Sequence, residues 1–468
     1  MVKETVARLT PQIGTQTESR AEQRMPPAWV SLPVAQGEIR HPTNGGNGIW
    51  YSENTGAMRA RLLELVNSAK EVLCISSFII ADPLLQKAVL TAVGRRVRVY
   101  ILTATEQKLL KGSARDDEFS EKVLADHVQL LGDFALRTLL RSGENLHAKY
   151  VVVDPNTSGL RGMVFTCNLA TEGLTRNPEL AVEMSGEEAR DMFRMFVFGF
   201  WKQSKRELLE LDKITANRPF QSEGMSGPRM LPCTFEGSAR LKAEVDRLVR
   251  GARNQLWVAS WKFTPAHQSV KTIEEVAKRG VDVRLLTSIR PSPEHMEALV
   301  NLAKAGVQVR GLRYLHAKAI VSDIEGGPQG LMMSANFDTH GLDDGYEAGI
   351  RLSDARLASV EAIMRWWWGS ATHSLEVDKT LGELPATEAS LYRNGGFEEI
   401  QIAEEHQVNL EPIVARNEGE MTTARPARFP VPETTGRRVY YKAINYRWTI
   451  LPPPTAGRAQ SDGKSGKQ

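Results

Sequence analysis

The chain has 468 residues, of which 41% are hydrophobic, 25% charged and 7% aromatic, a composition that excludes a fibrous repeat or wholesale disorder and leaves room for about three average domains. Its cysteines, Cys74, Cys167 and Cys233, are odd in number and widely spaced, which indicates neither a disulfide framework nor a thiol metal cluster. The net charge is only +3, yet residues 425–468 carry nine Lys/Arg against two Asp/Glu, so the positive charge is concentrated in the C-terminal tail.

The N-terminal segment is polar. Its first residues, MVKETVARLTPQIGTQTESRAEQRMPPAW, lack the apolar core of a signal peptide, and no apolar run in the chain reaches membrane-spanning length. We therefore expect a cytoplasmic protein without stable membrane insertion, in which residues 1–47 form an N-terminal extension.

The rest of the chain repeats itself. Residues 58–78, MRARLLELVNSAKEVLCISSF, combine an apolar period of about 3.6 with a short apolar run, which predicts a helix followed by a buried strand. Residues 239–261 have the same pattern, and GRRVRVYILT at 94–103 is similarly matched by KRGVDVRLLT at 278–287. Next come LHAKYVVVD at 146–154 and LHAKAIVSD at 315–323.

Each repeat closes with an aromatic-rich helix, at 192–201 and 360–369. We assign the tryptophans of the second helix, Trp366, Trp367 and Trp368, to the core. Strands that alternate with helices predict an α/β fold with helices covering a mostly parallel or mixed sheet. We divide the repeat into a first half, 48–215, and a second half, 216–375.

Residues 376–468 form a basic C-terminal extension, predicted to be partly extended because Pro, Gly and Ser clusters replace the periodic pattern. Its cations alternate with aromatic rings, a combination that suits single-stranded nucleic acid. The candidate nucleic-acid-binding residues are Arg437, Arg438, Tyr440, Lys442, Arg447 and Trp448. The alternative is an arm that docks on the body of the protein or on a partner.

The repeated LHAK segments indicate the chemistry. Side chains at i and i+2 of a strand point to the same face, so His147 projects with Lys149, and His316 with Lys318. If the halves pack about a pseudo-twofold axis, two imidazoles and two ammonium groups converge on a pocket suited to a phosphate. One neutral imidazole can then attack phosphorus while the other protonates the leaving oxygen.

These motifs resemble those of a known family. HAKYVVVD followed by FTCN, and HAKAIVSD followed by MSAN, are similar to the HxKxxxxD and GSxN signature of the phospholipase D superfamily. The resemblance covers about residues 48–370. It implies two tandem α/β sandwich halves packed as a pseudo-twofold dimer within one chain, a covalent phosphohistidine intermediate, and no metal or cofactor.

The resemblance also implies roles for individual residues, with one complete set in each half. It assigns the catalytic set to His147, Lys149, Asp154, Glu179, His316, Lys318, Asp323 and Glu347, and phosphate binding to Thr166, Asn168, Ser334 and Asn336. Within the catalytic set, the lysines hold the phosphate oxygens, the aspartates shape the site and the glutamates orient the histidines. We expect His147 to be the nucleophile and His316 the acid. The signature glycine is replaced by Phe165 and Met333, which we take as a mark of lineage.

The motif specifies a phosphodiester but not its class. Because no signal peptide or membrane span is evident and the tail is basic and aromatic, we favour a metal-independent nuclease that hydrolyses DNA or RNA. By resemblance, it could serve an anti-phage or restriction system together with a helicase or other subunits. The alternatives are a phospholipid phosphodiesterase or phosphatidyltransferase, and a non-catalytic subunit that binds phosphate backbones. The oligomeric state is left open.

Overall fold

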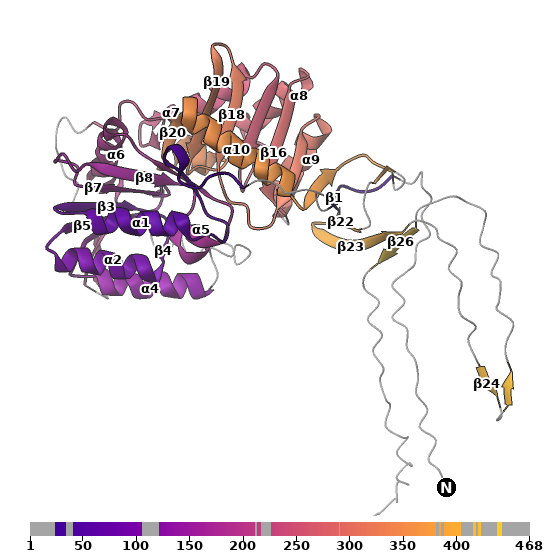
Figure 1. Cartoon of the computed structure of the whole chain (residues 1–468), viewed down its shortest axis with the longest axis horizontal. Helices are drawn as coiled ribbons and strands as arrows, with labels where there is room; N and C mark the ends of the chain where they lie inside the picture. The colour runs from indigo at the N-terminus through magenta and orange to yellow at the C-terminus, as the bar shows by residue number, and fades with distance from the viewer. Residues whose placement is uncertain are drawn as a thin grey trace, which may run out of the picture.

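In the computed structural model the two halves form two lobes that lie side by side, and a group of strands extends from the second lobe (Figure 1). Each lobe is a mixed sheet with helices, which confirms the predicted α/β class. The structure describes residues 24–33, 41–104, 121–210, 213–216, 226–289, 291–380, 383–384, 388–403, 415–417, 420–422 and 438–441.

Within these ranges the first half contains a nine-stranded sheet. Strands β3, β5 and β6 run parallel, and helices make the crossovers that parallel neighbours need. From β3 the sheet continues antiparallel on its other side through β7. The spatial order is β12 (Lys213–Ala216), β11 (Arg206–Glu210), β6 (Leu139–Gly143), β5 (Arg98–Ala104), β3 (Val72–Ser76), β7 (Tyr150–Val153), β8 (Arg161–Phe165), β10 (Leu180–Glu183) and β2 (Ile49–Tyr51).

Helices cover both faces of this sheet. Leu73 and Ile75 of β3 pack in a core with α1, α2 and α4, whereas Cys74 belongs to the core that includes α6, as alternation along a strand requires. Helix α2 begins where the Asp82 carboxylate accepts a hydrogen bond from the Leu85 N–H. Apart from the strands of the large sheet, the elements of the first half are α1 (Ala57–Ser68), α2 (Pro83–Gly94), α4 (Glu121–Phe134), α5 (Thr171–Thr175), α6 (Gly186–Phe198), the helical turns η1 (Gly46–Gly48) and η3 (Gly199–Gln203), and the short strands β4 (Ile80–Ala81) and β9 (Leu169–Ala170).

The second half repeats this arrangement. Its parallel strands β15, β16 and β17 correspond to β3, β5 and β6, and β18, β19 and β20 continue antiparallel as β7, β8 and β10 do. The strands of this core are β15 (Gln255–Ala259), β16 (Asp282–Ser288), β17 (Gln308–Leu312), β18 (Ala319–Ile324), β19 (Gly327–Met333), β20 (Gly349–Leu352) and β21 (His373–Glu376). Its other elements are α7 (Arg240–Gly251), α8 (Gln268–Lys278), α9 (Pro293–Lys304), α10 (Asp354–Ser370), the turn η4 (His340–Asp344), β13 (Thr234–Phe235) and β14 (Ser238–Ala239).

Segments from both predicted extensions add strands to the second sheet. Strand β1 (Ala28–Ser31) pairs with β21 on one side and with β22 (Glu388–Arg393) on the other. The sheet then continues through β23 (Gly396–Ala403) to β26 (Arg438–Tyr441) (Figure 1). A separate hairpin is formed by β24 (Ala415–Asn417) and β25 (Glu420–Thr422). The boundaries drawn from the sequence at 47 and 376 therefore do not mark the edges of this sheet.

Of the six tail residues predicted to bind nucleic acid, two lie within the described residues and four lie outside them. Arg438 and Tyr440 lie in β26, whose backbone pairs with β23. Arg437, Lys442, Arg447 and Trp448 lie outside the described residues. Their proposed contact with nucleic acid stays a prediction.

A continuous apolar core joins the two halves. It contains Met192 and Met195 of α6 together with Trp366 and Trp367 of α10. Trp367 is 0% exposed and Trp366 8% exposed, and Trp368 packs partly buried against the same core, so the assignment of these tryptophans to the core is confirmed. This packing brings the two LHAK segments together.

Candidate active site

The two LHAK segments enter the site in matching ways, one just before β7 and one just before β18. Both are followed by buried strands that fix their position. The His147 N–H donates to the Tyr346 carbonyl (3.2 Å), and the His316 N–H donates to the Pro178 carbonyl (3.2 Å). Each histidine backbone is therefore tied to the segment of the other half that precedes the signature glutamate.

The glutamates orient the histidines across the interface between the halves. Nδ1 of His147 lies 2.6 Å from Oε1 of Glu347, and Nδ1 of His316 lies 2.6 Å from Oε1 of Glu179. Because a carboxylate only accepts hydrogen bonds, each ring carries its proton on Nδ1 and leaves Nε2 for chemistry. The expected orienting role fits this geometry, and each half supplies the glutamate for the other half's histidine.

A buried hydroxyl holds each glutamate. Thr166 donates to Oε2 of Glu179 at 2.5 Å, and Ser334 donates to Oε2 of Glu347. Both hydroxyl residues are 0% exposed. In this structure the hydroxyl hydrogens are therefore directed to the glutamates, and phosphate binding by Thr166 and Ser334 stays a prediction. The same contacts hold Glu179 and Glu347 in place beside the histidines.

The lysines stand directly beside the rings. Nζ of Lys149 is 2.8 Å from both ring nitrogens of His147, and Nζ of Lys318 is 2.8 and 3.0 Å from those of His316. Both lysines are 0% exposed. Two cations at the reactive nitrogens favour an anionic group, as the predicted phosphate-binding role requires.

The signature asparagines lie at the ends of the neighbouring strands. Asn168 is 2% exposed and Asn336 is 8% exposed. Oδ1 of Asn336 is buried and has no hydrogen-bond partner among the described residues. Phosphate binding by the two asparagines stays a prediction.

The two aspartates of the motif accept hydrogen bonds from backbone turns. The Asp154 carboxylate accepts hydrogen bonds from the N–H groups of Lys70, Glu71 and Val72, and Asp323 does the same for the turn before β15. Each lies seven residues beyond its histidine, roughly 20 Å along an extended strand. The aspartates thus tie a helix–strand turn to the motif strand, which fits the expected role of shaping the site, and their place in the catalytic set stays a prediction.

Burial controls the charge of the site. It lowers the pKa of His147 well below its usual range, and the ammonium of Lys149 lowers it further. The ring is therefore neutral near pH 7, the form that can attack phosphorus. Burial raises the pKa of Glu347, and the charge of Lys149 and the Ser334 hydroxyl oppose this shift by favouring the ionised carboxylate.

The model of the family described as "Cardiolipin synthase, PLD-like domain" matches residues 62–197 and 245–368, more than half of the chain. The chain belongs to the phospholipase D-like family. It is thus an enzyme of the phosphodiesterase type that characterises this superfamily, and both matched segments contain a complete histidine–lysine motif.

Individual relatives extend over both halves. Cardiolipin synthase A of Pseudomonas aeruginosa is 23% identical over 346 residues, 69% of this chain and 68% of the relative. That of Pseudomonas fluorescens is 26% identical over 363 residues, 71% of this chain and 70% of the relative. The crystal structure of a phosphatidylserine synthase from Haemophilus influenzae shares the fold, with a TM-score of 0.50 and 12% identity over 75% of this chain and 90% of that one. Along the described residues, none of the helices combines the length and the apolarity needed to cross a membrane.

Three rings beside this phospholipase D-like site were not among the predicted residues. Phe78 lies 5.1 Å from the His147 ring and Trp261 lies 5.6 Å from the His316 ring, measured between centroids. The repeat carried a signal for this pair, because the matched segments 58–78 and 239–261 both end in an aromatic residue. The third ring, His340, is 6.1 Å from His147, and the equivalent position in the first half holds Glu172.

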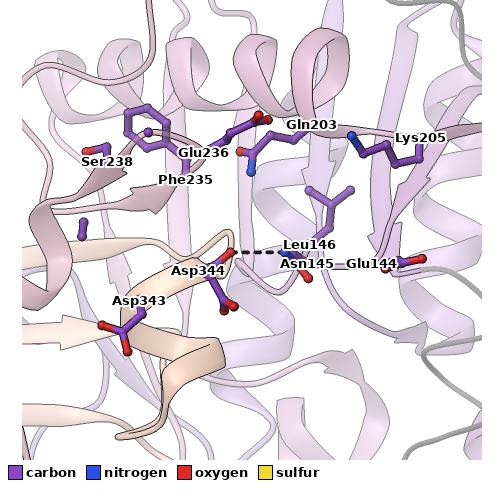
Figure 2. A pocket seen from close by; sticks show the side chains of 12 residues that line it. Glu144, Asn145, Leu146, Gln203, Lys205, Phe235, Glu236, Ser238, Asp343 and Asp344 are labelled. Carbon is purple, nitrogen blue, oxygen red and sulfur yellow. Dashed lines mark hydrogen bonds between the residues drawn. The ribbon is translucent and has the colours of Figure 1, made fainter. Parts of the chain in front are cut away.

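A cavity of about 840 Å³ lies where the two halves meet, but it is not the catalytic centre. Figure 2 shows Leu146 and Asn145 beside Asp344, with Gln203 and Glu236 above them. The Asn145 side-chain amide donates to the Asp344 carbonyl at 3.3 Å. His147, His316 and the two motif lysines are not among the residues that line the cavity.

Proposed function

We propose that the protein is a phosphatidyltransferase or phospholipid phosphodiesterase, which cleaves the headgroup ester of a glycerophospholipid. Two complete histidine–lysine pairs, each with a glutamate from the other half, support phosphodiester chemistry. The relatives that match across both halves are cardiolipin synthases, and this observation carries the choice of a lipid. It favours the phospholipid alternative over the nuclease that the basic tail suggested.

In the first step, Nε2 of His147 attacks phosphorus, so that an N–P bond forms and the P–O bond to the leaving group breaks. His316, protonated at Nε2, gives its proton to the departing oxygen. Lys149 and Lys318 offset the charge that builds up on the non-bridging oxygens. The lowered pKa of His147 supports its assignment as nucleophile, because the neutral ring attacks.

In the second step, the neutral His316 removes a proton from an incoming hydroxyl, whose oxygen attacks phosphorus as the N–P bond breaks. A lipid headgroup alcohol as acceptor gives transfer, and water gives hydrolysis. Glu347 stabilises the cationic phosphohistidine from Nδ1, and Glu179 does the same for protonated His316. The two halves thus act as nucleophile and acid–base in one cycle.

The test incubates the purified protein with vesicles of phosphatidylglycerol, which offers both a phosphatidyl group and an acceptor hydroxyl. Mass spectrometry should detect cardiolipin and glycerol from transfer, or phosphatidic acid from hydrolysis. Labelled single-stranded DNA, double-stranded DNA and RNA run in parallel, with His147→Ala as the inactive control. Cleavage of nucleic acid without any lipid product would overturn the proposal in favour of the nuclease.

A further inference from the structure

His340 is a third imidazole beside the catalytic pair. It begins the π-helical turn η4, four residues after Asn336. Its ring centroid lies 6.1 Å from that of His147, with the ring planes at 64°. The side chain is 32% exposed, yet its Nε2 atom is buried and has no hydrogen-bond partner among the described residues. A buried polar atom without a partner is costly unless a water, an ion or a ligand completes it.

The turn that carries His340 is held firmly. Oδ1 of Asp338 accepts from the Gly341 N–H at 2.7 Å, and the Asp338 carbonyl accepts from the Leu342 N–H at 2.9 Å. A Cβ at Gly341 would lie 2.4 Å from the Asn336 carbonyl oxygen, so the close approach of the turn to the signature asparagine requires glycine. His340 is therefore presented on a fixed piece of backbone.

The two nitrogens of His340 have different surroundings. Nδ1 is 3.8 Å from Oδ1 of Asp344, which is too long for a hydrogen bond. The buried Nε2 remains on the other edge of the ring. A ring that carries a proton on Nε2 presents an N–H on this edge to an anion.

We propose that His340 is a substrate-contacting residue whose Nε2–H donates a hydrogen bond to a non-bridging oxygen of the phosphodiester, on the side of the site where His147 attacks. The Nε2–H of His340 would then face the non-bridging oxygen whose negative charge increases as the N–P bond forms, which is the place for a preorganised donor. It also explains an asymmetry between the halves, since the equivalent position in the first half is Glu172 and an anion there could not serve a phosphate.

This inference concerns the phosphoryl group, which phosphodiesters of every class share. It rests on the two-histidine chemistry but not on the lipid substrate. The test therefore uses a substrate without a lipid or a nucleoside, so failure of the lipid proposal and failure of the His340 proposal are distinguishable.

The experiment compares His340→Gln with His340→Met, because the two replacements have similar size and only glutamine retains an N–H donor. Glu172→Gln at the equivalent position of the first half is the matched control. The readouts are kcat and KM for bis(p-nitrophenyl) phosphate and the inhibition constant of orthovanadate, with circular dichroism and a melting curve to confirm folding.

We expect His340→Met to lower kcat/KM by about 10- to 100-fold and to weaken vanadate inhibition to a similar extent, as loss of a hydrogen bond to a charged group should. His340→Gln should recover most of both losses, and Glu172→Gln should match the wild type. Equal losses in the glutamine and methionine variants would overturn the proposal by showing a packing role. Wild-type values in the folded methionine variant would overturn it as well.

Discussion

Replacing Glu347 by glutamine should slow the attack on phosphorus made by His147, a residue of the other half. The substitution keeps the shape of the side chain but removes a charge whose Oε1 lies 2.6 Å from Nδ1 of His147. The charge centres are about 4 Å apart, so at an effective dielectric constant of about 20 the carboxylate stabilises a cationic ring by about 4 kcal/mol. That energy corresponds to a rate loss of about a thousandfold.

The assay distinguishes the nucleophile from the acid by varying the leaving group of the substrate. A p-nitrophenolate leaves without being protonated, whereas an alkoxide needs an acid. Glu347→Gln should therefore slow the first burst of product from both p-nitrophenyl and alkyl phosphodiesters. Glu179→Gln, which acts on His316, should slow the burst only with the alkyl leaving group.

The matched controls are His147→Ala and His316→Ala, whose burst phases define the two patterns. Glu347→Gln should resemble the first control and Glu179→Gln the second, both less severely. If Glu347→Gln instead follows the His316 pattern, the glutamates serve the histidines of their own halves, and the cross-half pairing fails. An unchanged burst in both glutamine variants would refute the electrostatic argument altogether.

Three further predictions follow from single features of the structure. Asp154→Asn should lower the free energy of unfolding by about 2 kcal/mol or more, because backbone donors at Lys70, Glu71 and Val72 lose a charged acceptor. Unfolding in urea should show this loss of stability, while kcat per folded molecule should not fall to a matching extent. Burial lowers the pKa of His295 to about 3, so the unfolded state takes up a proton before the folded state does as the pH falls. This histidine alone should therefore lower the free energy of unfolding by roughly 2 kcal/mol between about pH 7 and pH 5. Melting curves recorded across this pH range should show a smaller loss of stability for His295→Gln. Turnover should survive EDTA, because imidazoles and lysines perform the catalysis, and dependence on an added divalent ion would contradict this.

The fold and the reactive groups could be predicted largely from local patterns. Alternating helix and strand patterns specify an α/β class, and the i, i+2 spacing of His147 and Lys149 places both side chains on one face of an extended segment. The same argument applies to His316 and Lys318. The role of Asp154 could not be derived this way, because its partners in the turn before β3 lie 82 to 84 positions away in sequence.

By itself, then, the sequence determined that the chain is a duplicated α/β protein with two copies of a histidine–lysine motif, because these features depend on residues close together in the chain. Only the tertiary structure decided which glutamate serves which histidine, since Glu347 is 200 positions from His147 and Glu179 is 137 positions from His316. Contacts over such separations depend on how the two halves pack through their shared apolar core. The same packing placed His340 beside the ring of His147, whereas the equivalent position in the first half holds Glu172.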